Sequence, residues 1–497
     1  MNYDLLKEPW INVLYNNKPR LMGLLDVYGK MGKIQSVLGT PTEKIALMRL
    51  MVCITQTALN GPSDEKGWRT CKKDISSKSI KYLEGKKKLF DLYGDRPFLQ
   101  IRHLSGPFTR DTFSLKFTAA TGNNHMLHDL HARDGIDREL PDNEIASYLV
   151  QTQLFAECGR KSAPSGELRW GKKAIQHYNE AAPLNGRLVT IVYGDSLLDT
   201  IHLNLVTKDE LNGAKIPFGV PVWDLDIKSQ QDSAAVEATR TYLYNLVPAS
   251  RAILLNRSDK KMIYCEGIKR PDIPHGKYSM PFIDPWLTLI PIKEDKERMY
   301  LKIISNKYPW RDLCSLLALL NLDKTTGGPW AFRHLRAKMN TNITIYTGGI
   351  EYSNANPIIA MEWHLVIPAE IFRETSLTMY ANLVKSANDA AISVSIALKM
   401  YKKLMEGNKK SSIYDAMLSE ALKVYWDSLN RHADILIRNI DNEEAQEEWL
   451  KTVHNTAKRC FEQVCTAHPS SGGTHFSNFV EALSYLIFRL NKMKEAA

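Results

Sequence analysis

Three histidines spaced three residues apart are the first candidates for chemistry in this sequence. His125, His128 and His131 form the pattern H-x-x-H-x-x-H, and Asp129 lies within it. Neutral imidazole is a common metal ligand, and a bound metal could activate water for phosphodiester hydrolysis. Steps of three drift around a helix, however, and no second acidic or cysteine cluster completes a ligand set. We therefore favour histidines that lie at the surface or contact nucleic acid, with no metal; a metal-dependent phosphodiesterase is the alternative.

Other signatures of catalysis are missing from the sequence. It contains no G-x-x-x-x-G-K-[ST], no G-x-G-x-x-G and no G-x-S-x-G. The usual forms of the phosphate-binding loop, the dinucleotide fingerprint and the nucleophile elbow are therefore excluded. Seven cysteines are scattered along the chain without a C-x-x-C pair. This odd number favours reduced thiols in a cytoplasm over a disulfide framework or a cysteine zinc site.

Residues 348–357 have the composition of a polar loop between two strands, which we expect at 343–347 and 363–367. The segment ends in a proline and contains Gly348, Gly349, Ser353, Asn354 and Ala355. Gly, Asn and Pro are ordinary turn residues. The same composition also lets a backbone approach a DNA duplex and direct a short amide into the minor groove. The residues alone leave both interpretations open.

Lysine and arginine residues gather in short clusters before residue 370. One such cluster is usually a solvated surface. Clusters confined to one part of a chain are more informative, because a basic part beside a neutral part suggests an electrostatic footprint for nucleic acid. The clusters are Lys72-Lys73, Lys86-Lys87-Lys88, Arg160-Lys161, Arg169 with Lys172-Lys173, Lys260-Lys261, Lys269-Arg270, and Arg333 with Arg336 and Lys338.

The formal charge divides the chain at about residue 370. The 497 residues carry 65 Lys and Arg against 55 Asp and Glu, a net charge of +10. Residues 370–497 contain 16 basic and 16 acidic residues, so the whole excess lies in the first 369 residues. Of the 22 prolines, only Pro469 follows residue 370. The sequence thus predicts a basic body rich in loops and a neutral helical tail.

Hydrophobic patterns predict that the body mixes helices and strands. Residues 10–22 are typical of a hairpin with a turn near Asn16 and Asn17, and a helix is expected to begin at 41–43 and to end before Gly61. Short alternating runs between 187 and 206 and between 250 and 305 predict strands. The weak periodicity from 104 to 187 predicts long loops, which are more often functional than accidental.

After Pro368 the pattern changes to helices with apolar stripes, in which Leu383, Ala387, Ala391 and Val394 recur at steps of three and four. Helices joined by short loops favour a four-helix bundle. We therefore expect an α+β chain, with a large mixed α/β domain at 1–368 and a C-terminal four-helix bundle at 369–497. The expected helices span 370–405, 411–429, 441–467 and 474–493.

No membrane segment is expected. The sequence has no uninterrupted apolar run of about 18 residues, the length that a spanning helix needs. Residues 1–8 lack a basic stretch followed by an apolar one, so no signal peptide is indicated. With 44% apolar and 24% charged residues, the composition is that of a folded protein, which we expect to be cytoplasmic and without membrane contact.

Several segments, taken in order along the chain, resemble parts of one known family. They are Glu8–Val13, Ile45–Gln56, Tyr93 with Pro97–Gln100, Gly122–Asp129 and Gly348–Ala355. The chain resembles the CasA family, the large subunit of the type I-E CRISPR Cascade complex. The resemblance covers nearly the whole chain and depends on the order and spacing of the segments. It extends to the neutral tail, which resembles the C-terminal four-helix bundle of that family.

The resemblance implies a subunit that is not an enzyme and holds no cofactor. CasA proteins inspect double-stranded target DNA for the protospacer-adjacent motif (PAM), a short tag that licenses targeting. They help to open the duplex for pairing with the guide crRNA, which forms an R-loop, and they recruit a helicase–nuclease in antiviral defence. Because base pairing reads the sequence, the protein has only the tag to read. The implied partners are crRNA, double-stranded target DNA, the CRISPR helicase–nuclease, and the backbone, 5′-handle and small subunits of Cascade.

The resemblance also assigns candidate site residues. Asn354 takes the position of the family's glutamine wedge, and Lys269 that of its lysine finger, while residues 159–166 correspond to a glycine-rich loop. The loop that reaches the guide-bearing part of the complex corresponds to Asn123, Asn124, Leu127 and His128. The residues so assigned to DNA and PAM binding are Lys269, Asn354, Ser353, Ala355, Gly348, Gly349, Arg160 and Lys161.

Overall fold

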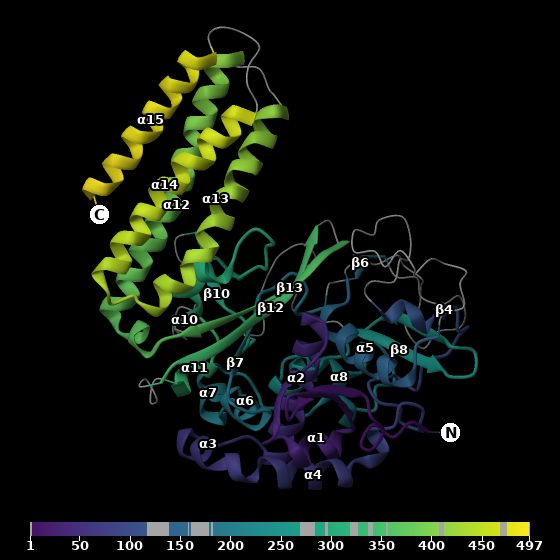
Figure 1. Ribbon diagram of the computed structural model, residues 1–497. Coiled ribbons are helices and arrows are strands. Elements are labelled where there is room, and N and C mark those ends of the chain that lie inside the picture. The colour runs from purple at the N-terminus through teal and green to yellow at the C-terminus, as the bar shows by residue number, and fades with distance from the viewer. Residues whose placement is uncertain are drawn as a thin grey trace. The chain divides into compact units, whose positions relative to one another are not determined.

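The computed structural model of the chain contains both helices and strands and has a helical C-terminal region (Figure 1), which confirms the predicted fold class. Among the described helices, none is long and apolar enough to cross a membrane. The structure describes residues 2–116, 139–157, 159–160, 178–179, 182–268, 284–293, 297–318, 327–335, 341–353, 356–406, 412–467 and 475–496.

The chain forms two compact units, and each draws on more than one stretch of the sequence. The first unit consists of Met1–Ser305, Ala318–Leu335 and Ile345–His364. The second consists of Asn306–Leu317, Arg336–Thr344 and Leu365–Ala497. The second unit therefore includes a short stretch that precedes Pro368 by about 50 residues.

A three-stranded sheet opens the first unit. In it β1 (Ile11–Tyr15) pairs with β2 (Lys18–Met22) on one side and with β3 (Ile34–Val37) on the other. Asn16 and Asn17 turn the hairpin with φ values of 47° and 60°, the left-handed conformation that a two-residue turn of type I′ requires. The predicted hairpin is thus confirmed. The edge strand β2 carries Lys, Pro and Arg, which disfavour pairing with a further chain.

The longest helix of the first unit is α2 (Pro41–Leu59), which the sequence predicted at both ends. A capping box begins it: the Thr40 hydroxyl accepts the Glu43 N–H, and the Glu43 carboxylate accepts the Thr40 N–H. Asn60, with φ 55°, ends it in the left-handed conformation. Most of α2 is buried, and the helices that pack against it include α4 (Ile75–Gly85) and α5 (Asp142–Phe155).

The other helices of the first unit are short. They are α1 (Leu24–Lys30), α3 (Glu65–Cys71), α6 (Leu197–Leu203), α7 (Lys208–Gly213), α8 (Ser233–Ala238), α9 (Tyr242–Leu246) and α11 (Ala331–Leu335). Single 3-10 turns lie at Lys72–Asp74, Lys87–Leu89, Thr112–Leu115 and Val222–Asp224. One hydrophobic core runs through these elements, from the N-terminal sheet to Tyr346 and Ile350.

Small antiparallel sheets complete the first unit and confirm the strands expected between 250 and 305. One sheet has the order β4-β9-β8, with β4 (Arg110–Asp111), β8 (Arg251–Asn256) and β9 (Lys261–Glu266). Two-stranded pairs are formed by β5 (Gly159–Arg160) with β6 (Tyr178–Asn179) and by β10 (Leu289–Lys293) with β11 (Glu297–Tyr300).

A long hairpin corrects the predicted loop at 348–357. Strand β12 (Ile343–Ser353) is followed by β13 (Asn356–Ile367), and β12 lies between β13 and β7 (Val189–Tyr193). Gly348, Gly349 and Ser353 therefore belong to a strand, and the predicted strands at 343–347 and 363–367 are parts of longer ones. Composition typical of a turn was misleading here, because these glycines serve close packing within the sheet.

The second unit is built around four long helices, as the sequence predicted (Figure 1). The four are α12 (Glu374–Glu406), α13 (Ser412–Arg438), α14 (Glu443–Ala467) and α15 (His475–Ala496). Helices α12 and α14 each contact all three of the others, which makes the arrangement a bundle. Helix α13 extends past the break expected after 429, because Leu429, Ala433 and Leu436 continue its buried stripe.

Part of the core of the second unit comes from outside the four helices. A 3-10 turn at Pro309–Asp312 leads into α10 (Leu313–Leu317), and a second turn at Ala369–Phe372 precedes α12. Trp310 is 2% exposed, and its ring contacts the rings of Trp426 and Trp449 at centroid distances of 6.2 and 5.4 Å. The Trp310 indole N–H donates to Asn430 Oδ1 over 2.7 Å, so both a hydrogen bond and ring packing hold this tryptophan.

Candidate nucleic-acid interface

Most of the site residues predicted from the sequence lie outside the described residues. Gly348 and Gly349 are described in full in β12, whereas Arg160 in β5 and Ser353 at the end of β12 are described in their backbone alone. The predicted residues that lie outside are Lys161, Lys269, Asn354, Ala355, Asn123, Asn124, Leu127 and His128, together with His125 and His131 of the metal alternative.

The described residues next to three of these segments are linked to one another. The chain reaches Lys161 after α5, Lys269 after Ile268 and Asn354 after Tyr352 and Ser353. A chain of hydrogen bonds connects these three points within the first unit. We call the residues that make it the junction: Gln153, Phe155, Glu157, Ala249, Ser250, Arg251, Gly267, Ile268 and Tyr352.

Tyr352 links the tip of the hairpin to the end of α5. Its hydroxyl donates a hydrogen bond to the backbone carbonyl of Phe155, with an Oη–O distance of 2.8 Å. Phe155 is the last residue of α5, where carbonyls have no partner within the helix. The bond therefore satisfies a helix end and joins the hairpin to the segment that continues towards Arg160.

Arg251 links the same segment to the β8–β9 pair. Its guanidinium donates to the Glu157 carbonyl over 2.5 Å and to the Ser250 carbonyl over 2.6 Å. Its backbone is held by the Gln153 side chain, whose amide donates to the Arg251 carbonyl at 2.9 Å and accepts the Arg251 N–H at 2.8 Å. Arg251 is 2% exposed, so these bonds form away from water, where they are strong.

Gly267 completes the junction immediately before the segment that contains Lys269. The N–H groups of Gly267 and Ile268 donate to the carbonyls of Ser250 and Ala249, at 3.2 and 2.9 Å. A Cβ atom at Gly267 would lie 2.0 Å from the Ala249 carbonyl oxygen, which is a backbone atom that cannot move aside cheaply. A glycine is therefore required where the chain passes this close to the residues that precede β8.

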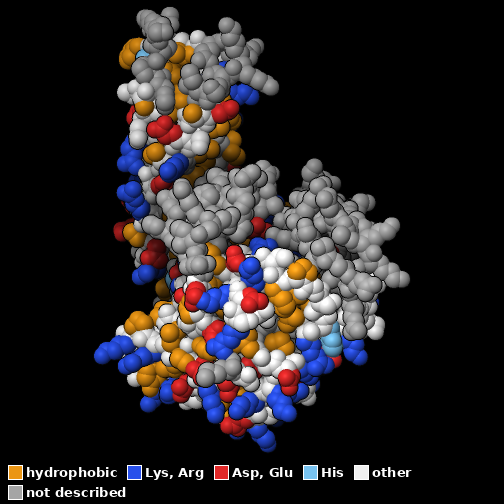
Figure 2. Space-filling model, turned by 90° about the vertical axis from the view of Figure 1, so that its right-hand side faces the viewer, with side chains coloured by type: hydrophobic (Ala, Val, Ile, Leu, Met, Phe, Trp, Pro, Cys, Tyr) orange, Lys and Arg blue, Asp and Glu red, His pale blue; other side chains and the backbone are white. Residues whose placement is uncertain are grey.

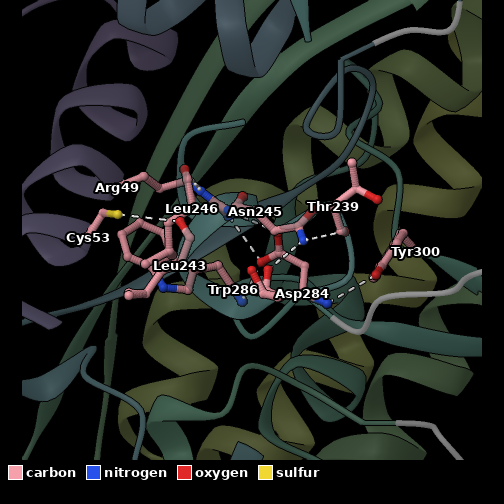
Figure 3. A network of polar contacts seen from close by, with 10 residues as sticks. Arg49, Cys53, Thr239, Leu243, Asn245, Leu246, Asp284, Trp286 and Tyr300 are labelled. Atoms are coloured by element: carbon pink, nitrogen blue, oxygen red, sulfur yellow. Dashed lines mark hydrogen bonds and ion pairs between the residues drawn. The ribbon is translucent and has the colours of Figure 1, made fainter. Parts of the chain in front are cut away.

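A buried ion pair holds Asp284, the first described residue after the segment that contains Lys269 (Figure 3). Arg49 in α2 is fully buried, and its guanidinium contacts both carboxylate oxygens of Asp284 at 3.0 and 2.9 Å. The remaining donors of Arg49 bond the carbonyls of Leu246 and Asn245, at 3.0 and 2.7 Å. The Arg49 guanidinium also lies 5.5 Å from the centre of the Trp286 ring. Each of the three guanidinium nitrogens of Arg49 thus has a partner, as a buried charge requires.

The hairpin is fixed to the start of α2 as well. Lys44 Nζ contacts both carboxylate oxygens of Glu362 in β13, at 2.7 and 3.0 Å, and the Tyr346 hydroxyl donates to the same carboxylate at 3.0 Å. Burial and the Glu362 charge raise the pKa of Tyr346, so its hydroxyl stays protonated and able to donate. Burial lowers the pKa of the neighbouring His364 in spite of Glu362, which favours its neutral form.

The glycines of the hairpin have a packing role. A Cβ at Gly349 would lie 2.6 Å from the carbonyl oxygen of Arg187, next to β7. A Cβ at Gly348 would lie 2.8 Å from the Tyr346 hydroxyl and 3.0 Å from the Met361 carbonyl oxygen. These contacts let the backbone of β12 approach its neighbours closely.

Carboxylates compensate several of the basic clusters within the described part of the chain. Lys72 pairs with Asp199, and Lys260 with Glu139. In the cluster at 86–88, Lys86 pairs with Asp224 at 2.9 Å and Lys87 with Asp4 at 3.6 Å. Basic and acidic side chains are accordingly interspersed on the face of the molecule that Figure 2 shows. The described clusters therefore offer less uncompensated charge for phosphates than the sequence suggested.

A pocket beside the junction is lined by Arg96, Arg102 and Arg251, but these cations are already engaged. Arg102 forms a two-point contact with Asp226, at 3.0 and 2.7 Å, and Arg96 lies 3.4–3.5 Å from three backbone carbonyls. The hydrogen bond from Arg102, assisted by His103, lowers the pKa of Asp226 to about 2. The arginines at this pocket thus serve to hold the segment 96–102 against the rest of the first unit.

Neither a metal centre nor an activated thiol is found in the described ranges. No group of three or more His, Cys, Asp or Glu side chains in them could hold a metal ion. The described cysteines are unpaired, and burial raises the pKa of Cys71 and of Cys314 to about 11. These two thiols are therefore protonated at neutral pH and weak nucleophiles.

Sequence reasoning missed the residues that hold this region together. The partners of Tyr352 and Arg251 are backbone carbonyls, which leave no sequence signature. One available signal was Arg49, a charged residue in the otherwise apolar stretch Leu47–Met51, because a buried arginine requires a partner elsewhere in the chain.

Comparisons with known proteins agree on one family. The sequence matches the family model of CRISPR-associated protein Cse1 over residues 4–460. Among solved structures, Cse1 from Thermobifida fusca is 20% identical, with a TM-score of 0.79 over 99% of this chain and 98% of that one. CasA (Cse1) from Thermus thermophilus is 16% identical, with a TM-score of 0.75 over 99% of both chains.

A chain of a CRISPR RNA-guided surveillance complex is also similar, with 15% identity and a TM-score of 0.74 over 98% of this chain and 99% of that one. No curated protein matches the sequence. At 15–20% identity the structural matches show the fold of the chain. The match to the family model shows that the chain belongs to the Cse1 family.

Proposed function

Because the chain belongs to the CRISPR-associated Cse1 family, which confirms the resemblance to CasA, we propose that it is the large subunit of a type I-E Cascade surveillance complex. In this role it is not an enzyme. It recognises the PAM in double-stranded DNA, helps to unwind the target for pairing with crRNA, and recruits the helicase–nuclease. It acts in the cytoplasm, bound to crRNA and to the backbone, 5′-handle and small subunits.

The observation that supports this function best is the junction. Three segments that the resemblance assigns to DNA binding leave the described chain from residues that hydrogen bonds connect. A reader of a short tag needs such an arrangement, because several chemically different groups have to meet a few base pairs at once.

Each segment has a distinct role in this proposal. Lys269 reads the tag from the minor groove, and Asn354 separates the first base pair beyond it. Arg160 and Lys161 hold the phosphates of the same duplex, and their contacts make the affinity fall steeply as salt rises. Ser353 and Ala355 flank the wedge, and Gly348 and Gly349 support it from within β12.

Two further assignments follow from the same proposal. The segment with Asn123, Asn124, Leu127 and His128 contacts the part of the complex that carries the guide. Residues 1–368 read the duplex, and the bundle at 369–497 contacts neighbouring subunits or a DNA strand. Unstacking a base step costs a few kcal/mol, which guide pairing and backbone contacts recover as the R-loop forms.

The test of this function is the substitution Lys269→Ala in the assembled complex. We expect the affinity for a duplex with the tag to fall towards the affinity for the same duplex with a scrambled tag. Lys18→Ala, at an exposed lysine of β2, is the matched control for the loss of one positive charge. Unchanged affinity and unchanged tag preference after Lys269→Ala would remove Lys269 from the mechanism.

A further inference from the structure

The helical stretch at 63–89, which includes α3 and α4, carries nine basic residues that the structure divides into two sets (Figure 1). Five of them pair with carboxylates: Arg69 with Glu65, Lys72 with Asp199, Lys78 with Asp74, Lys86 with Asp224 and Lys87 with Asp4. The other four are exposed and form no ion pair with any residue that the structure describes: Lys66, Lys73, Lys81 and Lys88. We call these four lysines the row.

The row follows the outer side of this helical stretch. Each of its first three members lies two positions before a buried side chain: Lys66 before Trp68, Lys73 before Ile75 and Lys81 before Leu83. Two positions turn a helix by about 200°, so these lysines point away from the core. Lys88 comes directly before the buried Leu89 in the turn after α4. Steps of seven or eight residues separate the members, which is roughly 10–12 Å along a helix.

The acidic residues of the same stretch leave the row with an excess of positive charge. Of its four carboxylates, Glu65 and Asp74 are paired, Asp64 accepts the Gly67 N–H at the start of α3, and Glu84 is exposed between Lys81 and Lys88. Four lysines and one glutamate give the row and its surroundings a net charge of +3. By contrast, the exposed lysines of α14 have their counter-charges on the same helix: Lys451 pairs with Glu447, and Lys458 with Glu462.

The composition of this surface indicates which polyanion it suits. In residues 63–89, all of which the structure describes, every exposed residue is polar, charged or glycine. The aromatic residues of the stretch are withdrawn: Trp68 is buried, and the Tyr82 hydroxyl accepts the Trp223 indole N–H. Single-stranded nucleic acid binds by stacking on aromatic side chains, and protein partners need an apolar centre. A duplex hides its bases and presents phosphates, so it is the ligand that the row fits.

We propose that the row is a contact of this chain with the phosphates of double-stranded DNA, separate from the reading of the tag. The inference goes beyond the proposed function, because it concerns any duplex, with or without the tag. Lysine meets a phosphate as a point charge, and phosphate contacts carry no base information. The row therefore adds affinity that falls with salt and adds no preference for one sequence.

The variant that tests the inference replaces all four lysines of the row by glutamine. The measurement is the affinity of the full-length chain for a duplex without the tag, by fluorescence anisotropy between 50 and 200 mM salt. Each lost phosphate contact should lower the slope of log affinity against log salt by about 0.9, so the four together by up to about 3.6. The matched control replaces four exposed lysines of separate elements by glutamine: Lys7, Lys18, Lys215 and Lys228.

Two smaller variants divide the row. Lys66→Gln with Lys73→Gln, and Lys81→Gln with Lys88→Gln, should each lower the slope by up to about 1.8. All of these side chains are exposed, so the melting temperature should stay that of the parent chain. These double variants decide the question if the fourfold variant is poorly made.

The outcomes also separate the row from other roles. A slope that the row variant leaves unchanged, or that the control variant lowers equally, overturns the inference. Normal duplex binding with poor assembly of the complex would assign the row to an acidic protein partner instead. In the assembled complex, the ratio of affinities for tagged and scrambled duplexes should stay that of the parent; a lower ratio would mean that the row reads the tag. Failure of Lys269→Ala to change this ratio would refute the proposed function and leave the row untouched.

Discussion

The contacts that stabilise the first unit internally differ in kind from those that stabilise the second. In the first unit, ion pairs and hydrogen bonds join residues far apart in the sequence: Arg49 and Asp284 are 235 residues apart, and Lys44 and Glu362 are 318 apart. In the second unit, apolar stripes on long helices form most of the core, and Trp310 packs there against Trp426 and Trp449. Long helices carry their own pattern, whereas short strands and loops need specific partners to be placed.

This difference matches what each unit is proposed to do. A unit that presents loops to DNA has to fix the points where those loops leave the fold, and directional polar contacts fix a position more narrowly than apolar contacts do. A bundle that contacts neighbouring subunits needs a stiff surface, which helix packing provides. Loss of a buried polar link should therefore destabilise the first unit, and loss of a buried aromatic side chain the second.

The largest effect is expected for Arg49→Met. The substitution leaves the Asp284 carboxylate buried without its partner, and breaking such a pair costs about 3–5 kcal/mol. Urea unfolding of the first unit should show this loss. Lys30→Met is the matched control, because Lys30 pairs with Asp26 on an exposed helix surface, where a pair contributes roughly 0.3–0.5 kcal/mol.

The double variant Arg49→Met with Asp284→Leu sharpens this test. Replacing both charges by apolar groups removes the unpaired carboxylate, so the double variant should be more stable than Arg49→Met alone. A double variant as unstable as the single one would show that the carbonyls of Asn245 and Leu246, rather than Asp284, are the partners that Arg49 serves.

A comparable effect in the second unit is expected for Trp310→Ala. The indole is buried against Trp426 and Trp449, and its removal leaves a cavity that costs about 3–5 kcal/mol. Intrinsic fluorescence during unfolding should report the change in the bundle. Phe488→Ala, at a side chain that is 62% exposed, should change stability by less than about 0.5 kcal/mol. Equal effects of both variants would argue against an aromatic centre in this unit.

An intermediate effect is expected for Gly349→Ala. The added methyl group would meet the Arg187 carbonyl, and overpacking of this kind costs about 1–3 kcal/mol. Thermal unfolding measures it against Gly29→Ala in α1, where a Cβ has nothing within 4 Å and helix propensity favours alanine. If Gly349→Ala kept its stability and lost tag preference, the glycine would face DNA after all.

The smallest effect is expected for Asp226→Asn. Arg102 holds the pKa of Asp226 at about 2, below the usual 3.8, so the carboxylate stabilises the fold above pH 4 and loses that contribution as pH falls from 4 to 2. Asp226→Asn should flatten the dependence of the unfolding midpoint in that range. The effect is small because the carboxylate is 33% exposed. A midpoint that falls equally in both proteins would assign this pH dependence to other carboxylates.

Local sequence was enough to predict the elements whose signals are local. The turn at Asn16 and Asn17, the capped ends of α2 and the four helices of the bundle all follow from neighbouring residues. The segment with Gly348 and Gly349 was misjudged as a loop, because its strand conformation depends on β7, which lies about 150 residues earlier. Strand formation there depends on tertiary contacts, which the local composition cannot predict.

The candidate site could be predicted only in part, for a related reason. The resemblance supplied Lys269 and Asn354 through their order in the chain, although both lie outside the described residues. The supporting residues Arg251 and Tyr352 have no motif, because each holds a backbone carbonyl whose position follows from the fold. Charge counts suggested more free cations than the described part of the chain has, since pairs such as Lys86 with Asp224 form between residues far apart in the sequence.

The pairing of β7 with β12 can form only late in the synthesis of this protein. Tyr193 ends β7 and Ile343 begins β12, so 150 residues have to be made before the sheet can close. At about 5–20 residues per second a ribosome needs about 8–30 s for this stretch. During that time one edge of β7 has no partner from β12 and can pair with other nascent chains. Slower translation, or fewer chaperones, should therefore reduce the yield of this protein through its first unit before it affects the bundle.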